Sequence, residues 1–494
     1  MFVKRGLRTI VDIVSKNKLA TIIVSIAAFL RLYRLEEFTT FLSDQGRDAI
    51  IVRDIATLTH FTAIGAPSSI GQIFLGPFYY YLVAPFLLLF NFNPVGMTFG
   101  VAFFTILGLI IFYIGIKREG SYLTAIYFAI LVTFSFVNIE LSRFSWNPNL
   151  LPVFCFATLY LFYMFIKKKA IVYSLLFGAF LSLAIQLHHL AVFLVLPIGF
   201  ISFQTILTDK GKIKFVRNLF FSILGFIVFI SPLVIFDLRH GFINTRNFIT
   251  LFSKEQVISH GSLVSGFLDV NQSFINNVFQ IELSSFYAGG ITLIVALLTL
   301  ILLRKKKYGI LLELHLLSIF FFLVAFSFVN SFRHPHYYGV IYFSFFLILA
   351  FILSQLHTYK IFRYFVIPCL LITYIYLNAI HYYFFNPQGP NQIAYSKRIA
   401  SFVGTQIGNE PYNIATWPVS FTEDNFVYFL ILAGHTPADR KKLEITNQMF
   451  VLCIDKPCQV VDSPSWNISM FGKSKIDRIW QVENLTIYKL IHEK

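Results

Sequence analysis

Charge is scarce in this chain of 494 residues, because Asp, Glu, Lys and Arg together make up 13% of it, whereas hydrophobic residues make up 57%. The mean hydropathy is +0.71. A soluble protein of this size could not keep so much apolar surface from water. Apolar runs also recur at a length of roughly 20 residues, which a helix needs to cross a bilayer. The composition excludes an ordinary soluble enzyme and predicts a polytopic α-helical membrane protein.

Acidic residues are especially few, with 24 Asp and Glu against 40 Lys and Arg, which gives a formal net charge of +16. A nucleic-acid-binding domain gathers its cations on one face of a folded domain. Here the cations form short clusters between apolar runs, which is typical of the cytoplasmic loops of a membrane protein. We therefore expect no nucleic-acid partner and interpret the basic charge as a signal of topology.

Cysteine is rare as well, with four residues in the whole chain. Cys155 and Cys369 lie inside apolar runs, where a buried thiol is inert. Cys453 and Cys458 lie near the C-terminus and can form a disulfide if that region is extracytoplasmic. A Cys-x4-Cys pair alone is weak evidence for zinc, so we expect no metal site, and the disulfide remains open.

Basic clusters decide which apolar runs cross the membrane. The runs lie at 19–35, 76–92, 95–116, 121–139, 149–166, 170–187, 190–207, 216–236, 286–303, 308–329, 337–356 and 361–384. If all of them crossed, Lys117 and the basic stretch 304–307 would lie outside, against the cytoplasmic bias of Lys and Arg. The 76–92 run is short, rich in Tyr and contains Pro77 and Pro85, which favours a segment at the membrane surface. We therefore predict eleven spans in the cytoplasmic membrane of the cell, with a cytoplasmic N-terminus.

Two domains follow from this topology. Residues 1–384 form the transmembrane domain, in which 36–94 is the first external loop. Residues 385–494 contain short mixed elements separated by Pro, Gly and Asp, such as the strand-like YNIATW and NLTIYKLI. We expect them to form a small extracytoplasmic α/β domain.

The stretch FLSDQGRDA at 41–49 concentrates charge in the first external loop. If a helix begins near Ser43, then Asp44, Arg47 and Asp48 share one face. In the plainer interpretation, Ser43 caps the helix and Arg47 pairs with a carboxylate. In the chemical interpretation, a carboxylate in a partly dry cleft acts as a general base and the arginine holds a phosphate. Nucleotide-sugars are absent outside the cell, so an activated sugar would arrive there on a lipid.

DQGRDAIIVRDI followed by GPFYYYLVAPFLLLFNFNP resembles the membrane glycosyltransferases of the GT-C class. The closest parallel is the family-39 group of protein O-mannosyltransferases and aminoarabinose transferases, which carry Asp-Glu-x-Arg-Tyr in the first external loop. The resemblance implies that Asp44 is the catalytic aspartate and Arg47 the motif arginine, and that Tyr79 and Tyr80 belong to the family's second segment. The stretches 142–152, 235–248 and 333–346 also resemble this group.

The resemblance implies an inverting transfer of a hexose or pentose from a polyprenyl-phosphate donor to the hydroxyl of a lipid, glycan or protein acceptor. No cofactor is required in the mannosyltransferase branch, and whether this chain uses a divalent cation is left open. Two departures concern the donor: Gln45 replaces the usual acid after the aspartate, and Leu75 or Gly76 replaces a lysine that binds the lipid phosphate in the aminoarabinose transferases. One alternative is a polysaccharide polymerase or ligase, which would carry its key charges in a large later loop such as the long external loop that we predict at 237–285. The other is a membrane transporter.

Two further sets of residues are candidates for the site. External cations that suit the donor phosphate, or alternatively anchor the chain at the interface, are Arg239, His240, Arg333, His334 and His336. Residues that suit a sugar or acceptor cleft, or alternatively a structural role, are Arg143, Trp146, Asn147, His188, His189, Tyr79 and Tyr80.

The topology makes a testable prediction at Gly120, which we place on the cytoplasmic side. Gly120→Cys, in a variant without the native cysteines, is expected to react with a membrane-impermeant maleimide only after the membrane is permeabilised. Thr59→Cys, in the first external loop, is the matched control and should react in intact cells. Labelling of Gly120→Cys in intact cells would contradict the eleven-span arrangement.

Overall fold

The computed structural model describes residues 17–68, 73–208, 211–253, 262–304, 309–329, 332–418, 420–439, 442–454 and 456–493. The chain divides into two compact units. The first unit is made of residues 1–33, 62–82 and 99–386, and the second of residues 34–61, 83–98 and 387–494. The first external loop predicted at 36–94 is thus split, and residues 34–61 group with the C-terminal region.

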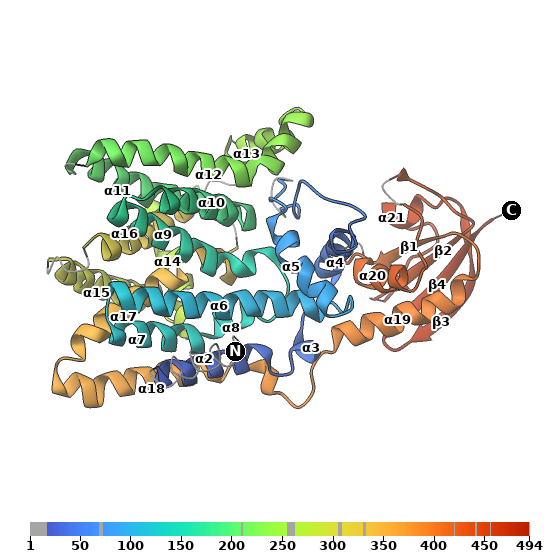
Figure 1. The fold of residues 1–494 in the computed structure, drawn as a ribbon. Coiled ribbons are helices and arrows are strands. Elements are labelled where there is room, and N and C mark those ends of the chain that lie inside the picture. The colour runs from blue at the N-terminus through green and yellow to red at the C-terminus, as the bar shows by residue number, and fades with distance from the viewer. Residues whose placement is uncertain are drawn as a thin grey trace, which may run out of the picture. The chain divides into compact units, whose positions relative to one another are not determined.

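The first unit is a bundle of helices that run side by side (Figure 1). A helix stands at each of the eleven predicted spans: α2 (Lys18–Leu32), α6 (Val95–Glu119), α7 (Tyr122–Phe134), α9 (Leu151–Lys168), α10 (Ile171–Leu187), α11 (Val195–Thr208), α12 (Lys212–Arg239), α15 (Ser285–Arg304), α16 (Gly309–Ser327), α17 (Tyr342–Leu356) and α18 (Ile367–Ala379). Among the described residues, seven helical segments are long and apolar enough to cross a membrane. The predicted fold class, a multi-pass α-helical membrane protein, is confirmed.

Basic residues mark where several of these helices end. Lys117 and Arg118 lie in the last turn of α6, and Lys167 and Lys168 lie in the last turn of α9. Cations suit this position because the backbone carbonyls at a helix C-terminus carry partial negative charge. Helix α5 (Phe78–Leu89) contains Pro85 and spans only 12 residues. Helices α7 and α18, which lie at predicted spans, are nearly as short at 13 residues each, so helix length does not test the non-crossing role of this run, which stays a prediction.

Helices α10 and α12 pack with their backbones in close contact. A Cβ atom on Gly178 would lie 1.8 Å from the Ser222 carbonyl oxygen, and one on Gly225 would lie 2.3 Å from the Leu175 carbonyl oxygen. Each helix thus presents a glycine to the backbone of the other. Small residues at such crossings allow the close approach on which helix association in lipid depends.

The segment 237–285, predicted as a long loop, contains two helices, α13 (Ile243–Ser253) and α14 (Leu263–Phe279). Asp237 accepts hydrogen bonds from the backbone N–H groups of Asn244 (2.7 Å) and Thr245 (3.2 Å) and so caps the first turn of α13. Helix α14 is amphipathic, and its apolar face is buried in the first unit. Short helical turns complete this unit: α8 (Phe136–Leu141), η1 (Asn147–Leu150), η2 (His189–Leu194), η3 (Pro335–Val340), η4 (Phe362–Val366) and η5 (Tyr383–Phe385).

The second unit contains a four-stranded sheet with the order β1-β2-β4-β3. Its strands are β1 (Tyr412–Trp417), β2 (Gln448–Cys453), β3 (Ser474–Val482) and β4 (Leu485–His492), and only the β1–β2 pair is parallel. Its helices are α3 (Leu35–Phe38), α4 (Ser43–Ala56), α19 (Gln392–Ile407), α20 (Asp424–Leu432) and α21 (Trp466–Ser469). Ala415, Met449, Val451 and Leu490 belong to its core. Cys453 and Cys458 form a disulfide.

The α10–α12 contact predicts the effect of a larger residue. Gly178→Leu is expected to force the two helices apart and to destabilise the purified protein by about 1–3 kcal/mol, the usual cost of overpacking. The midpoint of thermal unfolding, measured by size-exclusion chromatography after heating, should fall by several degrees. Gly199→Leu in α11 is the control, because no atom lies within 4 Å of its Cβ position. Equal midpoints for the two variants would refute the packing argument.

Candidate active site

Helix α4 begins at Ser43, and its first turn is held from two directions. The side-chain oxygen of Gln45 accepts a hydrogen bond from the Leu42 N–H at 3.2 Å, as the third residue of a capping box does. The Ser43 hydroxyl donates to the Thr422 carbonyl at 3.0 Å and accepts from the Thr422 N–H at 2.9 Å. Ser43 therefore joins α4 to the segment before α20. The N-terminus of α4 is capped by Gln45 instead of Ser43.

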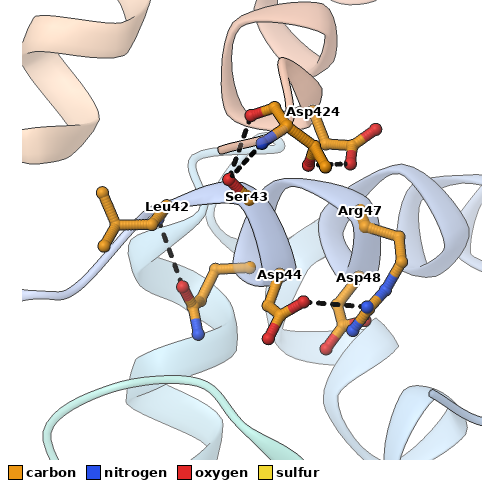
Figure 2. Close-up of polar contacts among 8 residues, drawn as sticks. Leu42, Ser43, Asp44, Arg47, Asp48 and Asp424 are labelled. Atoms are coloured by element: carbon orange, nitrogen blue, oxygen red, sulfur yellow. Dashed lines mark hydrogen bonds and ion pairs between the residues drawn. The ribbon is translucent and has the colours of Figure 1, made fainter. Parts of the chain in front are cut away.

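Asp44, Arg47 and Asp48 lie on one face of α4, as their spacing predicts, and Figure 2 shows them. The Nε and Nη2 groups of Arg47 donate to Oδ1 of Asp48 at 3.0 and 2.8 Å, and Nη1 donates to Oδ1 of Asp44 at 2.9 Å. Solvent exposure separates the two carboxylates, since the Asp44 side chain is 55% exposed and that of Asp48 is 0% exposed. Asp48 is thus an internal counter-charge for Arg47, and Asp44 is the carboxylate that a substrate can reach.

Helix α20 holds α4 by direct backbone contact within the second unit. A Cβ atom on Gly46 would lie 2.2 Å from the backbone nitrogen of Asn425. Next to this contact, the ring of Phe41 packs edge-on against Tyr428 and Phe429, with centroids 6.0 and 5.8 Å away. The position of Asp44 therefore depends on residues of the C-terminal region, which the sequence did not reveal.

A second group of predicted residues gathers in the first unit. The ring of His336 lies 4.6 Å from Trp146 and 5.8 Å from His188, centroid to centroid, and His334 stacks on His336 at 5.6 Å. Tyr337, which the sequence analysis did not single out, completes this cluster at 4.3 Å from His336. Burial, with a smaller contribution from neighbouring His334, lowers the pKa of His336 to about 3. His336 is therefore a neutral imidazole at physiological pH, suited to hydrogen bonding with a polar ligand.

Other residues predicted for a sugar or acceptor cleft are buried. Arg143 donates to the carbonyls of Leu30 at 2.9 Å and Tyr33 at 2.8 Å. Tyr79 and Tyr80 are each 1% exposed. The amide nitrogen of Asn147 donates to the Leu187 carbonyl at 3.1 Å, while its buried Oδ1 has no hydrogen-bond partner in the structure as described.

The predicted phosphate ligands lie in different surroundings. Arg239 and His240 are exposed at the end of α12, where Nδ1 of His240 lies 2.8 Å from the Phe236 carbonyl. Arg333 is 16% exposed, and its Nε donates to Oδ2 of Asp269 at 2.8 Å. The phosphate-binding role of these cations stays a prediction.

A small, mostly apolar cavity of about 210 Å³ lies in the first unit. Its lining includes Ile73, Leu75, Gly76, His189 and Leu233. His189 thus lies against an apolar space. Within the described ranges, no group of three His, Cys, Asp or Glu side chains is placed to hold a metal ion.

Comparison with known proteins finds one similar family and several similar structures. Residues 73–248 match the family described as dolichyl-phosphate-mannose-protein mannosyltransferase. Comparison with curated protein sequences gives no match. Among solved structures, ArnT from Cupriavidus metallidurans bound to undecaprenyl phosphate is similar, with a TM-score of 0.63 at 12% identity, covering 95% of this chain and 97% of that chain. The oligosaccharyltransferase of Archaeoglobus fulgidus has a TM-score of 0.53 at 12% identity, covering 88% of this chain and 67% of that chain.

At 12% identity these likenesses concern the fold, which is that of GT-C membrane proteins. The resemblance predicted from the sequence is confirmed, and the match with the mannosyltransferase family supports a glycosyltransferase. The matched region begins at residue 73, after α4 has ended. The roles of Asp44, Gln45, Arg47 and Asp48 therefore stay predictions.

The contact between α4 and α20 is testable at Gly46. Gly46→Ala is expected to push the two backbones apart, because neither can yield as a flexible side chain would, and to loosen α4. Amide hydrogen exchange in α4 should become at least about tenfold faster, which corresponds to about 1.4 kcal/mol.

Gly404→Ala in α19 is the control for this experiment. Its Cβ would lie 3.3 Å from a ring carbon of His435, a side chain that can shift. We expect exchange in α4 to stay as in the native protein. Unchanged exchange in Gly46→Ala would show that the contact does not hold α4.

Proposed function

We propose that this protein is an inverting glycosyltransferase that moves a sugar from a polyprenyl-phosphate donor to an acceptor hydroxyl at the outer face of the membrane. The match of residues 73–248 with a mannosyltransferase family and the GT-C fold support this proposal. The observation that carries it is the arrangement on α4, where one carboxylate is exposed and the arginine beside it is fixed by a buried one.

Asp44 is the proposed general base. Its carboxylate takes the proton of the acceptor hydroxyl, and the acceptor oxygen attacks C1 of the sugar from the face opposite the phosphate. The bond between C1 and the phosphate oxygen breaks, and its electron pair leaves with the polyprenyl phosphate. Configuration at C1 is inverted because there is one displacement and no covalent sugar–enzyme intermediate.

Arg47 is the proposed orienting group. Two of its donors are bound to buried Asp48, so the guanidinium stays in place while its Nη1 group holds one oxygen of Asp44 at 2.9 Å. The second oxygen of Asp44 can then face the acceptor. Positioning of this kind contributes to rate because the base needs no reorganisation when the reaction occurs.

The donor is proposed to be a sugar on a long isoprenoid phosphate. The similar structure of ArnT contains undecaprenyl phosphate, which supports a lipid of this type. The cavity beside Ile73 and Leu75 is apolar enough for isoprene units. The cations Arg239, His240, Arg333 and His334, together with neutral His336, remain our candidates for contacts with the phosphate.

We further propose that the N-terminus is cytoplasmic and that the C-terminal region lies outside the cytoplasmic membrane. The disulfide between Cys453 and Cys458 supports this orientation, because disulfides persist in oxidising compartments. We propose that transfer requires no metal ion. The acceptor is a lipid, a glycan or a protein.

Asp44→Asn is the decisive variant. It keeps the size and one hydrogen-bonding oxygen of the side chain but removes the base, so we expect transfer to fall by about 10²–10⁴-fold. The measurement is transfer of radiolabelled sugar from polyprenyl-phosphate donors in membranes that contain the variant, with and without EDTA. EDTA is expected to leave the native rate unchanged.

Asp54→Asn is the matched control, because Asp54 lies on the same helix and also pairs with an arginine. Its partner is Arg53, whereas that of Asp44 is Arg47. Its transfer rate should stay within about threefold of the native rate. Native transfer in Asp44→Asn membranes would remove the proposed mechanism, whereas equal losses in both variants would indicate damage to α4 instead.

A further inference from the structure

A polar cavity of about 550 Å³ lies in the first unit, along α14. Of the residues that line it, only Arg333 has been given another role above. The cavity is lined by Asp269, Gln272, Ser273, Asn276 and Asn277 of α14 and by Gln280, the residue that follows the C-terminus of this helix. They recur at intervals of three and four residues, so they form one stripe along the helix. Glu282, Arg333 and His381 complete the polar lining, and Ile281 is its one apolar member.

The opposite face of α14 explains why this stripe is presented to the cavity. Val270, Phe274, Ile275 and Val278 are buried in the first unit. Phe274 packs edge-on against Phe345 at 5.2 Å and stacks on Tyr342 at 5.8 Å. The helix is therefore anchored by its apolar side and cannot turn its amides away from the cavity without exposing that side.

Some polar groups of the lining already have partners in the chain. The Gln272 amide donates to the Leu283 carbonyl and accepts from the Ser285 hydroxyl, and Asn276 contacts both the N–H and the carbonyl of Leu283. These bonds fix the turn that follows α14. They make the wall of the cavity rigid.

Other groups of the lining have hydrogen-bonding capacity left. The amide nitrogen of Asn277 donates to the Ser273 carbonyl and that of Gln280 to the Asn277 carbonyl, which leaves both side-chain oxygens available as acceptors. Glu282 is exposed, and its carboxylate makes no hydrogen bond or ion pair within the described part of the chain. Nη2 of Arg333 remains as a donor, since Nε is bound to Asp269 and Nη1 to the Val329 carbonyl.

Charge and polarity limit what this cavity can bind. The charge of Arg333 is balanced by Asp269, and Glu282 adds a negative charge, so an anion such as phosphate is disfavoured in this cavity. We therefore assign Arg333 to this cavity rather than to the donor phosphate. The lining surface is about equally polar and apolar, and a lipid tail would leave its polar half without hydrogen bonds. A fixed set of neutral amide oxygens, a carboxylate and an arginine donor matches a ligand whose groups both donate and accept, as sugar hydroxyls do. The volume lies within the range of small-ligand pockets.

We propose that this cavity is a binding site for a neutral saccharide. Asn277, Gln280 and Glu282 accept hydrogen bonds from its hydroxyl groups, and Arg333 donates one. The site goes beyond the proposed transfer reaction and does not depend on it, because it requires neither Asp44 nor a lipid-linked donor.

Saccharide binding is measured directly on the full-length protein. The protein is purified in lauryldimethylamine oxide, because maltoside and glucoside detergents carry sugar headgroups that would compete for the site. The probes are maltotriose, mannotriose and triacetylchitotriose at up to 10 mM, observed by saturation-transfer difference NMR. We expect at least one of them to bind, and Asn277→Leu and Glu282→Leu each to weaken that binding at least tenfold.

Two control variants replace an amide and a carboxylate side chain elsewhere. Gln388→Leu and Glu410→Leu change exposed side chains of the second unit that line neither cavity. Binding should match the native protein in both. Inorganic phosphate at 10 mM should not displace the saccharide.

Three results would overturn the proposal. They are no saturation transfer to any of the three saccharides, native binding in both Asn277→Leu and Glu282→Leu, and displacement of the saccharide by phosphate. Binding without sugar transfer in the radiolabel assay would leave this site standing and count against the proposed function alone.

Discussion

The carbonyl groups in the last turn of a helix have no partner within that helix, and where they are buried in the protein no water is at hand to bond them. In the first unit, three arginines meet such groups. Arg31 donates to the Val132 carbonyl at the end of α7, Arg143 to the Leu30 and Tyr33 carbonyls at the end of α2, and Arg333 to the Val329 carbonyl just after α16. Arg31 and Arg143 each join one segment to the C-terminus of another, and Arg333 pairs with Asp269 of α14, so the few charges of this unit also connect its helices.

The second unit uses its charges for a different purpose. Buried Asp48 needs a cation, and removing the partner of a buried charge typically costs about 3–5 kcal/mol. Arg47 is therefore committed to Asp48, and only part of its hydrogen-bonding capacity reaches Asp44. This commitment favours an orienting role for Arg47 over a role as the principal ligand of a departing phosphate. That ligand is then to be sought among cations of other segments.

Features that depend on local periodicity could be predicted from the sequence. The apolar runs gave the positions of the helices, because a span needs a fixed length of apolar residues, and the spacing of Asp44, Arg47 and Asp48 gave their common face. The contact of Gly46 with Asn425 could not be predicted, because nothing local to α4 records a neighbour so distant in sequence. The exposure that distinguishes Asp44 from Asp48 also comes from tertiary packing. Helix α14 could have been predicted, because its polar residues recur at helical intervals, but its mixed composition indicated a loop.

The hydrogen bonds between Ser43 and Thr422 join residues 379 positions apart. A ribosome adds about 5–20 residues per second, so roughly 20–75 s pass between the synthesis of these two residues. Throughout that interval, the helix that carries Asp44 is already made while α20 does not yet exist. A chain interrupted before α20 would hold the proposed base without the contact that positions it. Biosynthesis thus delays assembly of the helix that carries the proposed base until almost the whole polypeptide has been made.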